Sequence, residues 1–236
     1  MRTSGESGGR WLRRAVRYGT YVALGGAAGV AAYRRWLRPM HQRWGASDAE
    51  VAARMPGDDL VRDPMEVTTR AVTVDAGPEH IWPWLLQMGY RRGGLYSYDW
   101  IDRLIGALDR DSAAEVLPQF QELKKGDVVP YAAGTEMTVE ELVPQRALVL
   151  AYRGEGAEVS QCFGLSPIDG SHTRLVLRVR ARLGRTAASF ANAAVIEPAE
   201  FFMVRRQLLG IQERAEALAR RGRAERALPV GIPAPS

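Results

Sequence analysis

Hydrophobic and polar residues alternate with a period of two in several runs after residue 64, which is typical of β-strands with one buried face. The first run, MEVTTRAVTV, is rich in Val and Thr, which favour strands. The turns that join the later runs, such as AAGT, PQR and DGS, are short enough for hairpins. The runs cover residues 65–74, 126–132, 135–143, 147–153, 158–168 and 172–183. They predict an antiparallel meander.

The last of these runs separates two kinds of side chain most cleanly. One face carries Leu175, Leu177, Val179 and Ala181, and the other carries Arg174, Arg178, Arg180 and Arg182. We expect the apolar face to meet a core and the arginine face to meet water.

Other segments have the period of a helix. After the first strand, the turn DAGP precedes a helix predicted over 78–89, which contains Pro83 and ends at Gly89. A second short helix follows, with Ser97 as its expected cap. Near the carboxy terminus, 197–221 is predicted to be a long helix with one apolar stripe. The stripe consists of Phe201, Val204, Leu208, Ile211, Ala215 and Leu218.

The strand ending AVTVDAGPEHIWPWL, the two short helices, the meander and the long last helix together resemble the SRPBCC, or START-related, superfamily. Within it, the chain looks like the polyketide cyclase/dehydrase and lipid-transport-like group, over roughly residues 65–221. The stretch WPWLLQMGYRRGGLYSYDWID also resembles membrane-attached relatives of actinobacterial type. The resemblance implies an α+β helix-grip fold, with a curved antiparallel sheet wrapped around the long helix. It also implies a cavity for a lipid, sterol or polyketide.

Residues 81–102 hold three of the six tryptophans and three of the eight tyrosines. The resemblance implies that these aromatic residues form the rim and floor of the cavity. The candidate ligand-binding residues are Trp82, Tyr96, Tyr98, Trp100, Gln161, Phe163, Phe201, Val204 and Leu208. Large aromatic side chains are also the usual fillers of a core, so a purely structural role stays open for each.

The positive charge of the chain is concentrated at its start. The net charge is +5, but the first 45 residues contain nine basic residues and one acidic residue. This leaves 23 basic and 26 acidic residues in the rest of the chain. A basic groove for nucleic acid is therefore not expected.

Residues 18–33 are uncharged and flanked by arginines, which predicts a membrane anchor over 18–38 after a basic segment, 1–17. Sixteen helical residues span only about 24 Å, so a cleaved export signal and an interfacial helix stay open as alternatives. We expect 39–64 to be a linker with a short helix capped by Ser47. The ligand-binding domain then covers 65–222, and 223–236 is a disordered tail.

No motif for covalent, metal or nucleotide chemistry is present. Cys162 is the single cysteine, the three histidines are far apart, and no phosphate-binding loop appears. We therefore predict no catalytic residue, metal or cofactor. The hypothesis is a membrane-tethered domain that binds an apolar or amphipathic small molecule without converting it. A cyclase or dehydratase on the same scaffold, and an envelope or stress interaction protein without a cavity, are the alternatives. The oligomeric state is left open.

Overall fold

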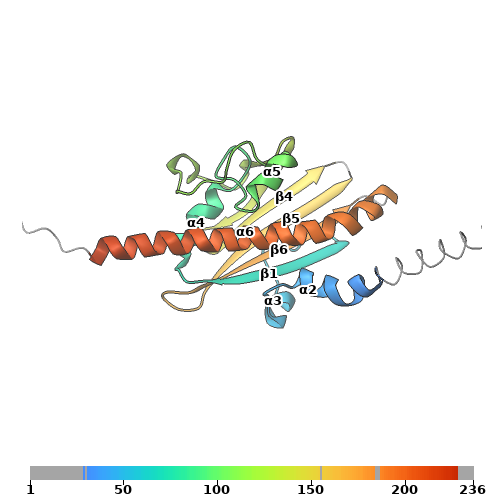
Figure 1. Ribbon diagram of the computed structural model, residues 1–236, viewed down its shortest axis with the longest axis horizontal. Helices are drawn as coiled ribbons and strands as arrows, with labels where there is room; N and C mark the ends of the chain where they lie inside the picture. The colour runs from blue at the N-terminus through green and yellow to red at the C-terminus, as the bar shows by residue number, and fades with distance from the viewer. Residues whose placement is uncertain (1–28, 30, 155, 184–186, 228–236) are drawn as a thin grey trace, which may run out of the picture. The chain divides into compact units, whose positions relative to one another are not determined.

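The computed structural model describes residues 29, 31–154, 156–183 and 187–227 (Figure 1). The chain divides into two compact units, Met1–His41 and Gln42–Ser236. In the first unit, the described residues include the π-helical turn η1 (Tyr33–Leu37), after which α2 (Arg38–Gln42) begins. Within the described part of the chain, no helix is both long and apolar enough to cross a bilayer. Most of the predicted anchor over 18–38 lies outside the described residues.

The second unit contains a six-stranded antiparallel sheet in the order β1-β6-β5-β4-β3-β2. From β2 onward each strand pairs with the next one in the sequence, and β1 joins the sheet beside β6. The strands are β1 (Glu66–Val74), β2 (Val128–Ala132), β3 (Thr135–Val143), β4 (Ala147–Gly154), β5 (Ala157–Pro167) and β6 (Thr173–Leu183). The predicted meander is confirmed.

One long helix lies across one face of this sheet, which makes the architecture an α+β helix-grip fold, as predicted (Figure 1). The helices of the second unit are α3 (Asp48–Ala52), α4 (Pro78–Gln87), α5 (Asp99–Leu104), the 3-10 turn η2 (Pro118–Phe120) and α6 (Ala187–Ala227). α6 begins ten residues earlier than the sequence predicts. Ala219 is the last buried residue of its apolar stripe. Leu218, which was predicted to end the stripe, is only half-buried.

The face of the sheet toward α6, here called the inner face, forms the main core. Phe163, Leu175 and Leu177 on the strands and Leu208 and Ile211 on α6 are at most 1% exposed. Burying an apolar side chain of this size contributes about 1.5–3 kcal/mol. These contacts fix α6 on the sheet.

α4 and the loop after it cover the part of the core that α6 leaves open. Trp84 and Tyr96 are buried with their rings edge to face, 6.0 Å apart, and the Tyr96 hydroxyl donates to the Trp84 carbonyl at 3.1 Å. Tyr96 has a φ of 60°, a strained conformation for a bulky residue that the surrounding packing must hold in place. Gly210 of α6 allows this loop to approach, since a Cβ there would overlap the Tyr96 carbonyl.

The two predicted helix caps have different outcomes. Ser47 caps α3 as expected, and Glu50 completes a capping box with it. Ser97 does not cap α5, whose N-cap residue is Tyr98, without a side-chain hydrogen bond. The Ser97 hydroxyl donates instead to the carboxyl of Asp102, which is 1% exposed. The need to satisfy this buried carboxyl overrides the local capping preference.

The arginine face of β6, expected to meet water, is covered by residues 47–63, here called the strap. The strap was expected to be part of a linker, but it packs on this outer face of the sheet. Arg178 is only 4% exposed and donates to the carbonyls of Glu50, Val51 and Ala53 at 2.6–3.0 Å. The carbonyls in the last turn of a helix have no partner within the helix, so the guanidinium caps α3.

Other contacts hold the strap as well. Arg178 pairs with Asp58 at 2.9 Å, and Arg174 pairs with Glu50 at 2.6 and 2.9 Å. Beneath the strap, Cys162 is 4% exposed, and burial raises the pKa of its thiol to about 12. Cys162 is therefore a small buried apolar residue and not a reactive thiolate.

Replacing Arg178 with Met is expected to lower the free energy of unfolding by about 2–4 kcal/mol, since Asp58 and the α3 carbonyls lose their partner. Arg182→Met is the matched control, because Arg182 lies on the same face of β6 in an exposed ion pair with Glu158. This control should change stability by less than about 1 kcal/mol. Urea unfolding followed by circular dichroism measures both. Equal effects of the two substitutions would contradict the role given to Arg178.

Candidate functional site

The inner face of the sheet is covered unevenly. Toward one end of β5 and β6, Phe163, Leu175 and Leu177 are fully buried. Toward the other end, inward-facing residues on the same strands and on β4 are only half-buried. These residues are Tyr152, Val159, Gln161, Val179 and Ala181. The region between the sheet and α6 is here called the grip. Its inward-facing residues are fully buried at one end and half-buried at the other, which is here called its open end.

Two polar side chains from distant strands meet at the open end. The amide nitrogen of Gln161 on β5 lies 3.4 Å from the hydroxyl of Tyr131 on β2. β3 and β4 lie between these strands, a separation of about 14 Å in a flat sheet, so the contact requires the sheet to curl. Burial raises the pKa of Tyr131, against hydrogen bonds from Gln161 and Gln207 that lower it. The Tyr131 hydroxyl therefore keeps its proton at neutral pH.

An ion pair joins β1 to α6 on the same inner face. Arg70 is 1% exposed and donates two hydrogen bonds of 2.7 Å to Glu200. Its guanidinium also lies over the ring of Phe201, 5.6 Å from the ring centre. The two-pronged pair places a carboxylate directly on the buried arginine, which offsets its positive charge.

Two buried polar atoms at this end have no hydrogen-bond partner among the described residues. They are the side-chain oxygens of Gln161 and Thr68, both inaccessible to solvent. The pairing of β1, β6 and β5 places both residues beside Val179, one on either side of it. An unsatisfied buried polar atom costs about 1–3 kcal/mol. A ligand with a hydrogen-bonding group would remove this cost.

Several residues predicted from the sequence do come together in the grip. Phe163 of β5 and Leu208 of α6 belong to the same hydrophobic core, and Val204 packs against it. Gln161 lies two residues before Phe163 on the same face of β5, and Phe201 lies beside Arg70 of β1. Gln161 and Val204 are half-buried, and the other three predicted residues are at most 7% exposed.

The predicted aromatic residues lie elsewhere. Trp82 and Tyr96 belong to the core under α4, and the Tyr96 hydroxyl is already bonded to Trp84. Tyr98 is half-buried at the start of α5. Trp100 is 64% exposed on α5, in contrast to the expected place in the cavity lining.

Sequence reasoning missed Tyr131, Gln207, Thr68 and Arg70, which supply most of the polar atoms of the site. Gln207 lies on the buried side of α6, three residues after Val204 and four before Ile211, and this helical spacing was a usable signal. Arg70 shares its face of β1 with Val72 and Val74, so strand alternation already placed an arginine on the apolar face. The meeting of Tyr131 with Gln161 had no comparable signal.

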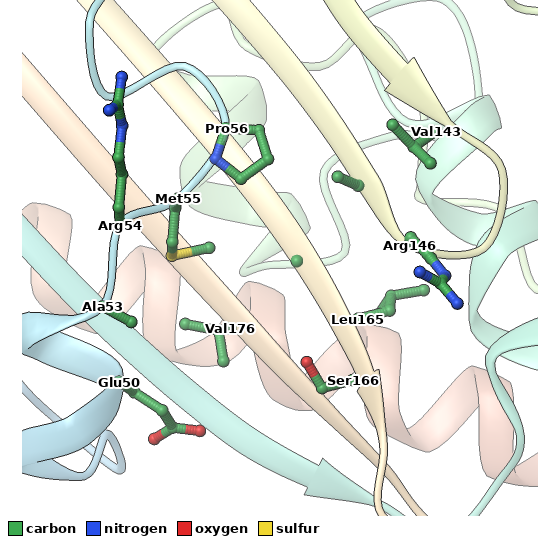
Figure 2. A pocket seen from close by; sticks show the side chains of 12 residues that line it. Glu50, Ala53, Arg54, Met55, Pro56, Val143, Arg146, Leu165, Ser166 and Val176 are labelled. Carbon is green, nitrogen blue, oxygen red and sulfur yellow. The ribbon is translucent and has the colours of Figure 1, made fainter.

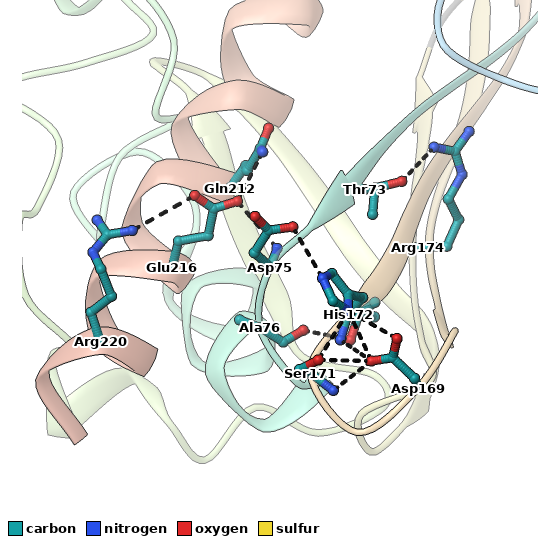
Figure 3. Close-up of polar contacts among 11 residues, drawn as sticks. Thr73, Asp75, Ala76, Asp169, Ser171, His172, Arg174, Gln212, Glu216 and Arg220 are labelled. Atoms are coloured by element: carbon teal, nitrogen blue, oxygen red, sulfur yellow. Dashed lines mark hydrogen bonds and ion pairs between the residues drawn. The ribbon is translucent and has the colours of Figure 1, made fainter. Parts of the chain in front are cut away.

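A polar cluster in the loop between β5 and β6 has the residue types of a catalytic triad (Figure 3). Ser171 Oγ and both carboxylate oxygens of Asp169 lie 2.9–3.0 Å from the same nitrogen of His172, Nδ1. In a triad the serine and the carboxylate contact opposite ring nitrogens, so this arrangement cannot activate Ser171. The backbone N–H of Ser171 lowers the pKa of Asp169, and the Asp169 hydrogen bond raises that of His172. The cluster stabilises a turn.

The described residues also form hollows outside the grip. One of about 390 Å³ lies on the outer face of the sheet beside the strap. Another of about 700 Å³ is lined by α4, residues 114–116 and the later part of α6. None of the nine predicted ligand-binding residues lines either hollow.

Comparisons with known proteins give likeness at the level of structure. Neither the scan against protein-family models nor the search of curated proteins finds a match. A conserved protein from Geobacillus kaustophilus is similar at 14% identity over 64% of this chain and 96% of its own, with a TM-score of 0.40. A START superfamily protein from Mycobacterium smegmatis is similar at 11% identity over 63% and 97%, with a TM-score of 0.38.

CalU16 from Micromonospora echinospora is similar at 15% identity over 65% of this chain and 86% of its own, with a TM-score of 0.32. All three TM-scores lie below 0.5. The fold assignment therefore rests on the strand order and on α6 in this chain itself.

The chemistry available at the open end of the grip is hydrogen bonding inside an apolar wall. Among the described residues, no group of His, Cys, Asp and Glu is arranged to hold a metal ion. Tyr131 and Gln161 supply donors, and Gln161 and Thr68 supply the oxygens left without partners. These groups can form hydrogen bonds with one neutral polar group of an otherwise apolar molecule.

Proposed function

We propose that this protein binds a neutral amphipathic molecule in the grip. The apolar part of the molecule lies between the inner face and α6, and its polar group meets Tyr131, Gln161 and Thr68. The observation that carries this proposal is the pair of buried, unpartnered oxygens of Gln161 and Thr68 on a face that is otherwise mainly apolar. A hydroxyl or amide group of a ligand can donate to such oxygens, and Tyr131 can donate to a carbonyl.

The charge balance of the site favours a neutral ligand. Arg70 already holds Glu200 through two hydrogen bonds, so the arginine is not available to a carboxylate or phosphate unless that pair breaks. Arg70 is buried, so separating it from Glu200 carries a free-energy cost that weakens the binding of an anionic ligand. Alcohols, ketones and amides with an apolar body avoid this cost.

Binding is tested with nile red, a neutral apolar dye with a carbonyl group, whose fluorescence rises in an apolar site. In the full-length protein, Tyr131→Phe should weaken nile red binding, and Gln161→Leu should weaken the displacement of the dye by 1-decanol, whose hydroxyl can donate to the Gln161 oxygen. Each effect should be about two- to tenfold, the value of one hydrogen bond. Tyr98→Phe is the control, because Tyr98 lies at the start of α5. 1-Decanol should displace the dye from the unsubstituted protein.

Unchanged affinity in both site variants, or an equal loss in the Tyr98 variant, would contradict this placement of the ligand. Conversion of a bound polyketide-like molecule would instead favour the enzyme alternative. Asp102 is the residue to replace in that case, since burial raises the pKa of its carboxyl above the usual range.

We further propose that the amino-terminal region attaches the protein to a membrane surface. Support comes from η1 and α2, where Trp36, Leu37 and Met40 are 47–69% exposed. Arg34, Arg35 and Arg38 lie between and beside them in the sequence. Tryptophan and arginine are suited to the headgroup depth of a bilayer, and each arginine adds about 1 kcal/mol on anionic lipid. Attachment would hold the grip close to an apolar ligand source.

Flotation with vesicles that contain anionic lipid tests the attachment. The full-length protein should float with the vesicles, and a variant with Trp36, Leu37 and Met40 all replaced by Ser should float less. Ile168→Ser is the control, because Ile168 is 59% exposed in the loop between β5 and β6. Absence of the full-length protein from the vesicle fraction would rule out this attachment.

A further inference from the structure

The hollow of about 390 Å³ on the outer face of the sheet has a floor of small residues (Figure 2). Ala147, Gly164 and Val176 are direct partners on the neighbouring strands β4, β5 and β6, so their positions form one row across the sheet. A row that runs from Ala to Gly to Val leaves space where larger side chains would fill the surface. The hollow is therefore a consequence of three residues in register.

The strap forms one wall of the hollow. Met55 and Pro56 line it, and a Cβ at Gly164 would lie 3.0 Å from the methyl carbon of Met55. Figure 2 shows Met55 on the strap side and Val143 on the other side. Methionine is flexible and polarizable, so it adapts its shape to an apolar occupant. The walls and the floor are thus mainly apolar.

The charged residues around the hollow leave an excess of positive charge. Glu50 lines it, but its carboxylate is held by Arg174, whose hydrogen bonds lower the pKa of Glu50 to about 2. Arg54 and Arg146 are exposed on opposite sides (Figure 2). Within the ranges that the structure describes, neither guanidinium has an ion-pair or hydrogen-bond partner. If a molecule in the hollow carried an anionic group at its edge, that group would lie near Arg54 on one side or Arg146 on the other.

We propose that this hollow binds an amphiphile with one anionic group and a short apolar chain. The chain lies on the row of Ala147, Gly164 and Val176, against Met55. The anionic group, a carboxylate or a sulfate, pairs with Arg146 or Arg54 at the edge. The volume lies near the lower end of the range for small-molecule sites, about 300–1,000 Å³, which suits a chain without bulky rings.

This site is independent of the grip, because the two lie on opposite faces of the sheet. Val176 faces outward on β6, while its neighbours Leu175 and Leu177 face the core. The two sites also differ in chemistry, since the grip has its arginine paired and the outer hollow has two arginines free to pair. Failure of either proposal leaves the other intact.

Decanoate tests the proposal, and 1-decanol, which has the same chain without the charge, is its control probe. The full-length protein is labelled with ¹³C at the methionine methyl groups, and the Met55 signal is assigned from a Met55→Leu variant. Decanoate below its micelle concentration should shift the Met55 signal and saturate. Replacing both Arg54 and Arg146 with Gln should weaken decanoate binding at Met55 about tenfold or more, the value of one charge-assisted hydrogen bond. The affinity of 1-decanol at Met55 should not change when the two arginines are replaced.

Arg182→Gln controls for the loss of positive charge, since Arg182 is exposed on β6 but does not line the hollow. Gly164→Leu should fill the hollow and abolish the Met55 shift, and the two arginine substitutions carry the test if this variant does not fold. The proposal is overturned if saturating decanoate leaves the Met55 signal unmoved. It is equally overturned if the arginine variant binds decanoate as tightly as the unsubstituted protein.

Discussion

One helix is too narrow to cover a six-stranded sheet, and much of this structure follows from that mismatch. Six strands are about 24 Å wide, whereas a helix with its side chains is about 10–12 Å in diameter. The sheet must therefore curl, and other segments must cover what α6 leaves open. α4 and the loop that holds Tyr96 perform this task, which explains why Trp82, Trp84 and Tyr96 gather in this part of the chain. Where neither reaches, the inner face stays half-buried, and this is the open end of the grip.

The outer face of the sheet is covered by a non-helical segment and one short helix, not by a long helix. The strap covers it, and Arg178 holds the strap by capping α3 and pairing with Asp58. The long aliphatic stem of an arginine lies well on an apolar sheet while its head reaches backbone carbonyls. The strap covers the sheet, and its residues Met55 and Pro56 also form a wall of the outer hollow. A sheet covered on both faces thus has a candidate binding site on each.

The sequence predicted the regular elements well, because their periods depend on local alternation. All six strands and the long helix were placed, and the helix-grip fold followed. The burial of charged residues was harder to predict. An arginine that faces water and an arginine that caps a helix occupy the same positions in the alternation of polar and apolar residues. Arg178 was therefore expected in solvent. Tyr131 and Gln161 are 30 residues apart and meet only because the sheet curls, which no local signal encodes. Trp100 was grouped with its aromatic neighbours, although it lies exposed on α5.

The central claim is that the unpartnered oxygens at the open end of the grip bind the polar group of a neutral ligand. The most direct test follows the side-chain amide signals of ¹⁵N-labelled glutamines by NMR while 1-decanol is added. The account predicts that the amides of Gln161 and Gln207 shift and saturate together. The amide of Gln212, which is bonded to Glu216 on α6, should stay in place. Saturable binding of decanol without any change at Gln161 would contradict the account, because the ligand would then occupy another part of the protein.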